Sequence, residues 1–215
     1  MSGRSFGSYC GVARALEVVG ERWALLVVRD LLVGPRRFTD LSRGLPKIPS
    51  NILSARLKEL EQAGVVTRRV LPRPAGSIVY ELTDDGRGLE EVVLALGRWG
   101  AQRLGERAPD EVVTADSLVM ALRTCFVPAA ARGLCARWEL RCGPIVLHAE
   151  VADGALTAGE GAPQGAELVI ETTELRGLLA GEVTPAQALA DGRVKIAGDP
   201  RLLDRFVAVF RIGPR

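Results

Sequence analysis

The sequence predicts an α+β protein with two domains, one covering residues 1–108 and the other residues 109–215. Its 215 residues and hydrophobic content of 47% provide material for two hydrophobic cores in domains of about 100 residues each. Apolar residues in the first half recur at three- and four-residue steps, which is typical of helices. In the second half they alternate along short runs, which is typical of strands, and helical segments separate some of these runs.

The first half begins with a series of predicted helices. Residues 10–20 carry apolar side chains on one face, and residues 21–34 are apolar on most sides, as expected of a buried central helix. The pair Gly34-Pro35 ends that helix. A short helix follows, with Thr39 as its expected N-cap.

The stretch IPSNILSARLKELEQAG, residues 48–64, predicts a helix with two unlike faces. Ser50 is placed to cap its start, and Gly64 to end it with a residue that tolerates positive φ. The inward face consists of Leu53, Leu57 and Leu60. The outward face consists of the small or polar residues Asn51, Ser54, Ala55, Lys58 and Gln62. Such a face has no large apolar side chain to bury, so we expect it to meet a polar partner.

A hairpin and a long helix complete the first half. Two β-rich runs, residues 65–70 and 78–82, are joined by a loop of Pro and Gly that carries Arg73, and a helix runs from Arg87 to about Leu104. This order is typical of a winged helix-turn-helix domain. In such a domain the second helix of the pair enters the major groove of DNA, and the hairpin loop lies over the backbone or minor groove.

The distribution of charge supports an anionic partner for this domain. The net charge of +2 divides into +5 over residues 1–105 and −3 over residues 106–215, and the window 36–73 holds nine basic and three acidic residues, net +6. A solvated, arginine-rich face is the alternative, but the order of elements favours DNA. The candidate DNA contacts are Arg36, Arg37, Lys47, Ser50, Asn51, Ser54, Arg56, Lys58 and Arg73.

Residues from about Tyr9 to Leu104 resemble the HxlR family of bacterial transcription regulators, which are relatives of the MarR group. The resemblance rests on Cys10, on GERWALLVVRDLLVGPRRFTDL and IPSNILSARLKELEQAGVV, and on YELTDDGRGL with a following Trp-Gly pair. It implies a homodimer with two recognition helices and two wings. Such regulators repress or activate transcription, and we expect a repressor.

The resemblance also implies that the long helix after the hairpin forms the dimer interface, although its apolar stripe could instead belong to the core of its own domain. The stripe consists of Leu89, Val92, Val93, Leu96 and Trp99. Two-fold symmetry would place the two recognition helices about 34 Å apart, on a pseudo-palindromic operator in double-stranded DNA.

Cys10 is a candidate redox sensor. Some HxlR relatives use a cysteine near the first helix in this way, and a helix N-terminus favours the thiolate. A small packing residue is the alternative. The other cysteines, Cys125, Cys135 and Cys142, show no CxxC spacing and are expected to be buried apolar residues.

Residues 115–134 predict one helix and its exit at Pro128. Four strand-like runs, two short helices, a last strand and a last helix over residues 199–210 follow, arranged on an antiparallel sheet. The segment GEVTPAQALADGRVKIAGDPRLLDRF resembles the end of sterol-carrier-protein type-two-like domains, which enclose an apolar cavity. The resemblance implies a site for a hydrophobic small molecule; a filled core that serves as scaffold is the alternative. The candidate lining residues are Phe126, Trp138, Leu140, Leu179, Phe206 and Phe210.

Catalytic chemistry has little support in the sequence. His148 is the single histidine, and the motifs GxGxxG and GxxxxGK[ST] do not occur. We therefore expect no enzyme activity, no cofactor and no metal site. No apolar run approaches the roughly 18 residues that span a bilayer, and the N-terminus lacks the apolar stretch of a signal peptide, so we expect a cytoplasmic protein without a membrane partner.

The sequence thus predicts a dimeric DNA-binding transcription regulator whose C-terminal domain binds an apolar small molecule or mediates assembly. The alternative from another class is a hydrophobic-ligand carrier that uses its winged helix for protein interaction. A carrier has no need for a window of net charge +6 around the recognition helix and wing, so the charge favours the regulator.

Overall fold

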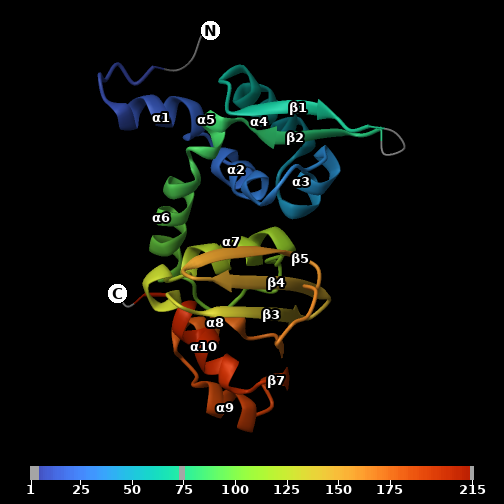
Figure 1. Cartoon of the computed structure of the whole chain (residues 1–215). Coiled ribbons are helices and arrows are strands. Elements are labelled where there is room, and N and C mark those ends of the chain that lie inside the picture. The colour runs from blue at the N-terminus through green and yellow to red at the C-terminus, as the bar shows by residue number, and fades with distance from the viewer. Residues whose placement is uncertain (1–4, 73–75, 214–215) are drawn as a thin grey trace. The chain divides into compact units, whose positions relative to one another are not determined.

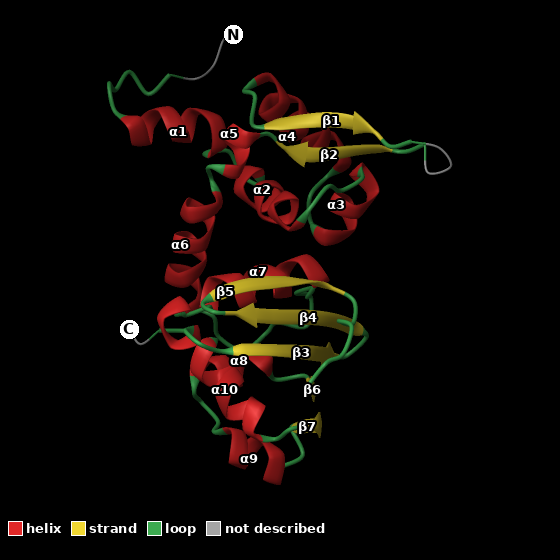
Figure 2. Cartoon of the chain, viewed as in Figure 1, coloured by secondary structure: helices red, strands yellow, loops and turns green. Residues whose placement is uncertain are grey.

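The structure is a computed structural model that describes residues 5–72 and 76–213. The chain forms two compact units, which divide between Val93 and Leu94. Figures 1 and 2 show helices with one β-hairpin in the first unit, and a sheet with helices in the second. This composition confirms the α+β class. The domain boundary at residue 108 stays a prediction, because the division by compactness falls inside one continuous helix.

The elements of the first unit follow the order that the sequence predicts. They are α1 (Gly11–Val19), α2 (Ala24–Val33), α3 (Phe38–Gly44), α4 (Ser50–Gln62), β1 (Val66–Val70), β2 (Ile78–Leu82), α5 (Asp84–Arg87) and α6 (Glu90–Ala101), the last of which continues into the second unit. The helix-turn-helix pair is therefore α3 and α4, and β1 and β2 form the wing.

The first unit has a hydrophobic core of its own. Val27 and Val28 of α2 pack there with Leu53, Leu57 and Leu60 of α4, and each of these side chains is at most 1% exposed. Each buried aliphatic side chain contributes about 1.5–3 kcal/mol relative to an exposed one. This packing confirms the predicted inward face of α4 and fixes which side of the helix remains outside.

Two helix starts differ from prediction by one or two residues. Thr39 lies inside α3, because Arg37 is the N-cap and donates its backbone N–H to Asp40 Oδ2 at 3.0 Å. Ser50 is the first residue of α4, not its cap. Pro49 precedes it with the extended conformation of an N-cap (φ −63°, ψ 142°) and no capping side chain.

The start of α2 is also later than predicted. The segment 21–34 was expected to be one helix, but α2 begins only at Ala24. Trp23, which precedes it, has φ +80° and lies in the left-handed region. Because helical residues need φ near −63°, the helix cannot extend back through this position.

The wing is held at its base by a third stretch of backbone. β1 and β2 pair antiparallel, with Val66 opposite Leu82. Arg36, just before α3, donates its N–H to the Tyr80 carbonyl at 3.0 Å and accepts the Tyr80 N–H at 2.8 Å. The connection between α2 and α3 is therefore hydrogen-bonded to the middle of β2.

Two glycines shape the ends of the wing. Gly64 has φ +76° and ends α4 as predicted, since only a residue without Cβ adopts that backbone without strain. At Gly86, in α5, a Cβ would lie 2.1 Å from the Val65 carbonyl oxygen. The chain returning from β2 can pack this closely against the start of β1 only because residue 86 has no side chain.

The second unit contains every helix and strand that the sequence predicts for it. Its elements are α7 (Ala115–Cys125), the 3-10 turn η1 (Pro128–Ala131), β3 (Cys135–Cys142), β4 (Ile145–Ala152), β5 (Ala155–Glu160), β6 (Leu168–Thr172), α8 (Leu175–Ala180), α9 (Pro185–Ala190), β7 (Val194–Gly198) and α10 (Arg201–Val209). Alternation along β4 matches the burial, because Leu147, Ala149 and Val151 are buried in the core.

The sheet of the second unit is mixed, so the prediction of an antiparallel sheet is wrong at one pairing. The strand order is β5-β4-β3-β6-β7, and β3 pairs with β6 in parallel, with Trp138 beside Leu168. The other pairings are antiparallel. Alternation identifies strands but not their neighbours, which contacts between distant parts of the chain decide.

An aromatic cluster forms the core of the second unit. The rings of Trp138, Phe206 and Phe210 are fully buried and lie 4.7 to 6.1 Å apart between centroids, and Phe126 packs on Phe210 at 5.6 Å. The indole N–H of Trp138 donates to the Leu202 carbonyl at 3.1 Å. These rings interlock in the edge-on and tilted geometries that filled cores favour.

Candidate nucleic-acid interface

The outer face of α4 presents small and polar side chains to solvent. Ser50, Asn51, Ser54 and Lys58 are all exposed, while three leucines hold the opposite side in the core. Short side chains in the first turns allow the backbone of a helix to approach base edges, and a lysine further along can reach phosphate. The face predicted to contact DNA is therefore free on the surface of this unit.

The candidate cations near α3 occupy different settings. Arg36 is half-buried, and its guanidinium donates to the Pro35 carbonyl at 3.0 Å, so the side chain folds back along the wing's base. Arg37 is exposed at the start of α3. Lys47 is exposed in the turn that leads into α4. Arg37 and Lys47 are thus both exposed, and each lies just before a helix of the helix-turn-helix pair: Arg37 before α3 and Lys47 before α4.

Arg56 is turned away from the outer face. Its side chain is only 15% exposed and forms ion pairs with Glu59, one turn on, and with Glu21 at 3.9 Å. Sequence reasoning placed Arg56 at the flank of the helix, and the structure agrees, but it adds two carboxylates. A phosphate contact by this residue would have to compete with them.

The wing carries two further arginines that the sequence analysis did not select. Arg69 forms a bidentate ion pair with Glu81, in which Nε donates to Oε1 and Nη2 donates to Oε2, each at 2.9 Å. This pairing lowers the pKa of the Glu81 carboxyl. Arg68 lies over the ring of Tyr80, 5.9 Å from its centroid. Strand alternation could have found Arg68, because it places successive side chains on opposite faces of the hairpin. Arg73, the predicted wing-tip contact, lies outside the described residues.

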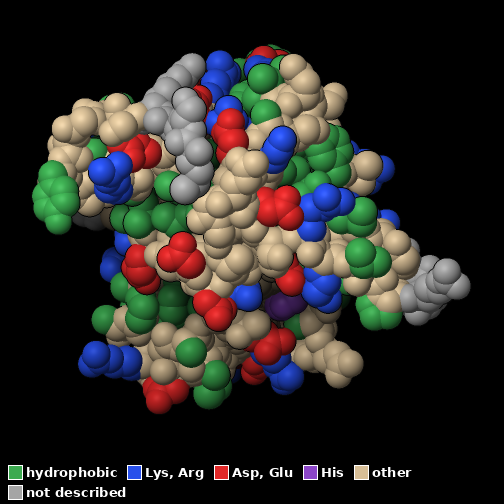
Figure 3. Space-filling model, turned by 90° about the horizontal axis from the view of Figure 1, so that it is seen from above, with side chains coloured by type: hydrophobic (Ala, Val, Ile, Leu, Met, Phe, Trp, Pro, Cys, Tyr) green, Lys and Arg blue, Asp and Glu red, His purple; other side chains and the backbone are tan. Residues whose placement is uncertain are grey.

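Positive charge is dispersed over this surface. In Figure 3, Lys and Arg side chains are interspersed with Asp and Glu side chains across the visible face. Two arginines of the 36–73 window are ion-paired, Arg56 with Glu59 and Arg69 with Glu81. The net charge of the 36–73 window therefore overstates how many of its cations are unpaired and ready to meet phosphate.

The apolar stripe of α6 divides into two parts. Leu89 and Val93 pack against the core of the first unit. Val92, Leu96 and Trp99 are 52%, 49% and 58% exposed. Core packing thus explains only part of the stripe, and the other three residues form an exposed apolar ridge at helical spacing along α6, with the Arg103 guanidinium stacked on Trp99 3.6 Å from the ring centroid.

Cys10 is the N-cap of α1 and is exposed. The backbone N–H groups of Ala13 and Val12, in the first turn of α1, lower the pKa of the Cys10 thiol below its ordinary value. Cys10 therefore does not pack in the core of the first unit, and its role as a redox sensor stays a prediction. Among the other cysteines, Cys125 is buried as expected, and burial raises its pKa to about 11.

The remaining two cysteines and His148 differ in burial. Cys142 is half-buried, whereas Cys135 is exposed at the start of β3, so the expectation of a buried side chain is wrong there. His148 is half-buried on β4, with Nδ1 3.2 Å from the Gly161 carbonyl oxygen. Within residues 5–72 and 76–213, no group of three or more metal-ligating side chains comes together, and no helix is both long and apolar enough to cross a membrane.

A helix-turn-helix pair with an exposed polar recognition face, followed by a two-stranded wing, defines a winged-helix DNA-binding protein. Comparison with known proteins identifies the family. Residues 18–108 match the model of the HxlR-like helix-turn-helix family. The chain belongs to this family, which confirms the resemblance seen in its sequence.

Several transcription regulators are similar to this chain over that part. The regulator YvaP of Bacillus subtilis is 38% identical over 89 residues, which are 41% of this chain and 82% of YvaP. YodB of the same organism is 38% identical over 88 residues, 41% of this chain and 79% of YodB. A solved structure of reduced YodB from B. subtilis aligns at 33% identity and a TM-score of 0.40, covering 47% of this chain and all of that one.

The family and these relatives make the chain a DNA-binding transcription regulator, and they agree with the expectation that it is not an enzyme. The matched residues end at 108, before the sheet of the second unit begins. The resemblance of that unit to sterol-carrier-type domains therefore stays a prediction.

Proposed function

We propose that the protein is a homodimeric transcription repressor that acts in the cytoplasm on a pseudo-palindromic operator. The observation that supports this most strongly is α4, a helix whose leucines are buried and whose outer face carries Asn51, Ser54 and Lys58 in solvent. Two such helices in a two-fold dimer would enter successive major grooves about 34 Å apart.

The proposed contacts fall into two kinds. Asn51 and Ser54 lie on the first turns and would read base edges, for which amide and hydroxyl groups are suited. Lys58, Lys47 and Arg37 are exposed cations that would bind phosphate and carry no sequence information. Ser50, at the first helical position, would contact the backbone. Contacts by the remaining candidates, Arg36, Arg56 and Arg73, are proposed as weaker contributions to backbone binding.

Replacing Lys58 with Ala is expected to weaken binding to operator and unrelated duplexes alike, and to reduce the slope of log affinity against log salt by about one. Asn51→Ala should instead lower the preference for the operator by about 1–3 kcal/mol. Fluorescence anisotropy with both duplexes, over a salt titration, measures these effects.

Lys195→Ala serves as the matched control, because it removes an exposed lysine of the second unit that already pairs with Glu171 at 3.7 Å. Equal losses in the Lys58 and Lys195 variants would contradict the proposed face. A promoter-reporter strain carrying Lys58→Ala should show raised expression if the protein represses; lowered expression would make it an activator.

The exposed ridge of Val92, Leu96 and Trp99 is the proposed dimer surface. A large apolar patch on a soluble protein indicates an interaction site, and three such residues on one helix would pair with their symmetry mates across a two-fold axis. Leu89 and Val93 lie on the same helix as the ridge and pack against the core of the first unit, so they would hold the helix in place.

Cys10 is proposed as an oxidant-sensitive thiol, because it is exposed and its thiolate is stabilised by the start of α1. Alkylation by iodoacetamide should therefore show its pH inflection lower in folded protein than in protein unfolded by urea. Since the folded pKa is the lower one, the thiolate's contribution to stability is present above the unfolded pKa and is lost as pH falls through the folded value.

Peptide mass mapping identifies which thiol has reacted, and Cys10→Ser provides the baseline. Cys125 should remain unmodified near pH 8, because its pKa is raised to about 11 and its side chain is buried. An inflection for Cys10 that is unchanged by unfolding would contradict its role as an activated thiol.

The second unit is proposed to act as a structural or assembly domain. The six residues predicted to line a ligand cavity are buried or half-buried, and the four aromatic ones pack against one another. This packing favours the filled core over the hydrophobic-ligand site, and with it the regulator over the carrier.

A further inference from the structure

The wing carries two neighbouring arginines in unlike settings. Arg68 and Arg69 follow one another on β1, so strand alternation turns their side chains to opposite faces of the hairpin. Both side chains are exposed, and both carry the same charge. Their partners on β2 therefore decide which of them can meet an anion.

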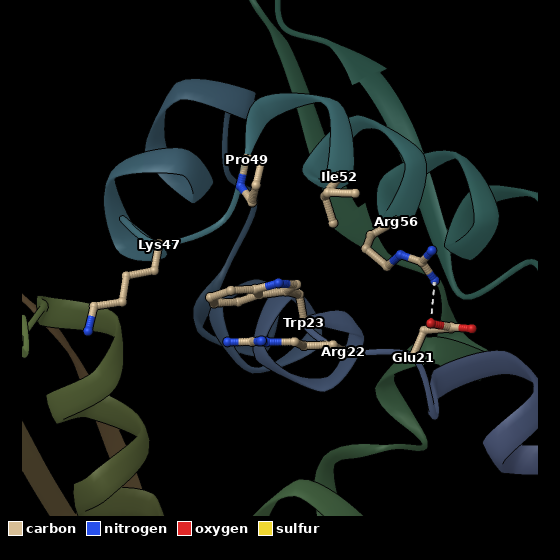
Figure 4. Close-up of a pocket in the computed structure, with 7 residues that line it drawn as sticks. All are labelled: Glu21, Arg22, Trp23, Lys47, Pro49, Ile52 and Arg56. Atoms are coloured by element: carbon tan, nitrogen blue, oxygen red, sulfur yellow. Dashed lines mark ion pairs between the residues drawn. The ribbon is translucent and has the colours of Figure 1, made fainter.

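Glu81 occupies the guanidinium of Arg69. Nε and Nη2 each donate to a carboxylate oxygen at 2.9 Å, which uses two of the five N–H donors and neutralises the charge. A phosphate at Arg69 would have to displace this carboxylate or bind beside it against its repulsion. Figure 4 shows a similar case on α4, where the guanidinium of Arg56 points to Glu21.

Arg68 has an aromatic ring as its partner. Its guanidinium carbon lies over the ring of Tyr80, 5.9 Å from the centroid, which is within the range of a cation–π contact. Over residues 5–72 and 76–213, no carboxylate forms an ion pair with Arg68. A ring face orients a guanidinium without taking up its N–H donors, so these stay available to an oxyanion.

The pairing of the strands brings Arg68 and the Tyr80 ring together. Tyr80 directs both of its backbone groups to Arg36, with N···O distances of 2.8 and 3.0 Å, and so away from β1. The directly opposite residues Arg68 and Tyr80 are therefore a non-hydrogen-bonded pair, the kind whose side chains lie closer. The bonds to Arg36 also hold the backbone of Tyr80, which makes its ring a fixed support for the guanidinium.

Arg68 lies on the hairpin face that meets the core of the first unit. That face also carries Val66 and Leu82, which are paired across the strands and buried in the core together with the leucines of α4. Since Val66 is two residues before Arg68, the arginine comes next along the same face, beyond the core. The available cation is thus on the side of the wing against which the recognition helix packs.

We propose that β2 selects the cation that the wing offers to DNA: Tyr80 orients Arg68 toward a backbone phosphate, and Glu81 prevents Arg69 from forming a second contact. The inference rests on the proposed function, because the phosphate belongs to the duplex that α4 binds. A guanidinium can place two N–H donors on one phosphate, which adds affinity without sequence preference. In this arrangement Tyr80 is a positioning residue, and Glu81 limits how tightly the wing binds.

The first test removes the charge of Arg68 from the full-length protein. Arg68→Gln should weaken binding to operator and unrelated duplexes alike, by about tenfold, and reduce the slope of log affinity against log salt by about one. The matched control is the double variant Arg69→Gln with Glu81→Gln, which removes the neighbouring arginine together with its partner and keeps the net charge. It should bind both duplexes as the wild type does.

The second test releases Arg69. Glu81→Gln should tighten binding to both duplexes and raise the salt slope by about one, because a second guanidinium becomes available to phosphate. Adding Arg69→Gln should remove that gain. Glu171→Gln is the control for net charge, since it frees Lys195 in the second unit and should leave the slope unchanged. An equal gain in Glu81→Gln and Glu171→Gln would overturn the assigned role of Glu81.

The third test separates orientation by Tyr80 from a purely structural role. Tyr80→Phe keeps the ring and should bind DNA as the wild type does, whereas Tyr80→Leu should weaken binding. In the Arg68→Gln background, Tyr80→Leu should cause no further loss, because the two residues act through one contact. An equal loss from Tyr80→Leu with and without Arg68 would overturn the positioning role.

Lys58→Ala, measured in the same titrations, separates this inference from the proposed function. If Lys58→Ala weakens binding while folded Arg68→Gln binds as the wild type does, DNA binding stands and the assignment of Arg68 is wrong. Equal losses in Arg68→Gln and in the double variant would show that β2 makes no selection, which also overturns the inference. If the wild type binds no duplex at any salt concentration, the proposed function fails and this inference fails with it.

Discussion

Replacing Leu96 with Glu is expected to convert the protein to monomers and to weaken operator binding by about 10²- to 10⁴-fold. Linked binding of two half-sites gains a factor of that size over a single contact, and monomers lose it. Leu96 lies in the middle of the exposed ridge of α6, so a carboxylate there would have to be buried without a partner in any dimer that uses this surface.

The exposure of Leu96 allows loss of the dimer to be distinguished from unfolding of the monomer. A residue that is 49% exposed in the single chain can accept a charge at little cost to the folded monomer. Arg98→Glu is the matched control: it introduces the same side chain two residues along α6, on the far side of the helix from the ridge. Sedimentation should give monomers for Leu96→Glu and dimers for the control. If Leu96→Glu remained dimeric, the dimer interface would lie on another surface.

Replacing Phe206 with Ala should reduce the free energy of unfolding of the second unit by about 3–5 kcal/mol. The ring is fully buried between those of Phe210, 4.7 Å away, and Trp138, 5.7 Å away, and its removal would leave a cavity that these partners cannot close. Urea unfolding, followed by the near-ultraviolet signal of the aromatic cluster, measures the loss.

Phe6→Ala provides the comparison, because Phe6 is exposed and its removal should change stability by about 0.5 kcal/mol or less. A loss of under about 1 kcal/mol for Phe206→Ala would indicate that the ring borders empty space. That result would favour the hydrophobic-ligand site that the sequence of the second half predicts over a filled core.

Local pattern was sufficient to predict the interface helix. The spacing of Leu53, Leu57 and Leu60 identifies the buried side, and the polarity of Asn51 and Lys58 identifies the exposed one, because both follow from the helical repeat alone. The ends of the helices were predicted less accurately. Ser50 has the chemistry of an N-cap, but the conformation of Pro49 decides where the helix starts.

Features that depend on distant residues could not be predicted in this way. The pairing of Arg56 with Glu21 joins α4 to the turn between α1 and α2, and the parallel pairing of β3 with β6 joins strands separated by two others in sequence. The left-handed conformation of Trp23 has no local signal either, since tryptophan is not among the residues that favour positive φ.

The hydrogen bonds between Arg36 and Tyr80 give the wing an uneven stiffness. A ribbon of two strands twists and bends easily, but this one is clamped halfway along β2, where Tyr80 stands opposite Arg68. α3 begins two residues after Arg36, so the same two hydrogen bonds tie the wing to the start of the helix-turn-helix pair. The two parts therefore share one hydrogen-bonded stretch of backbone.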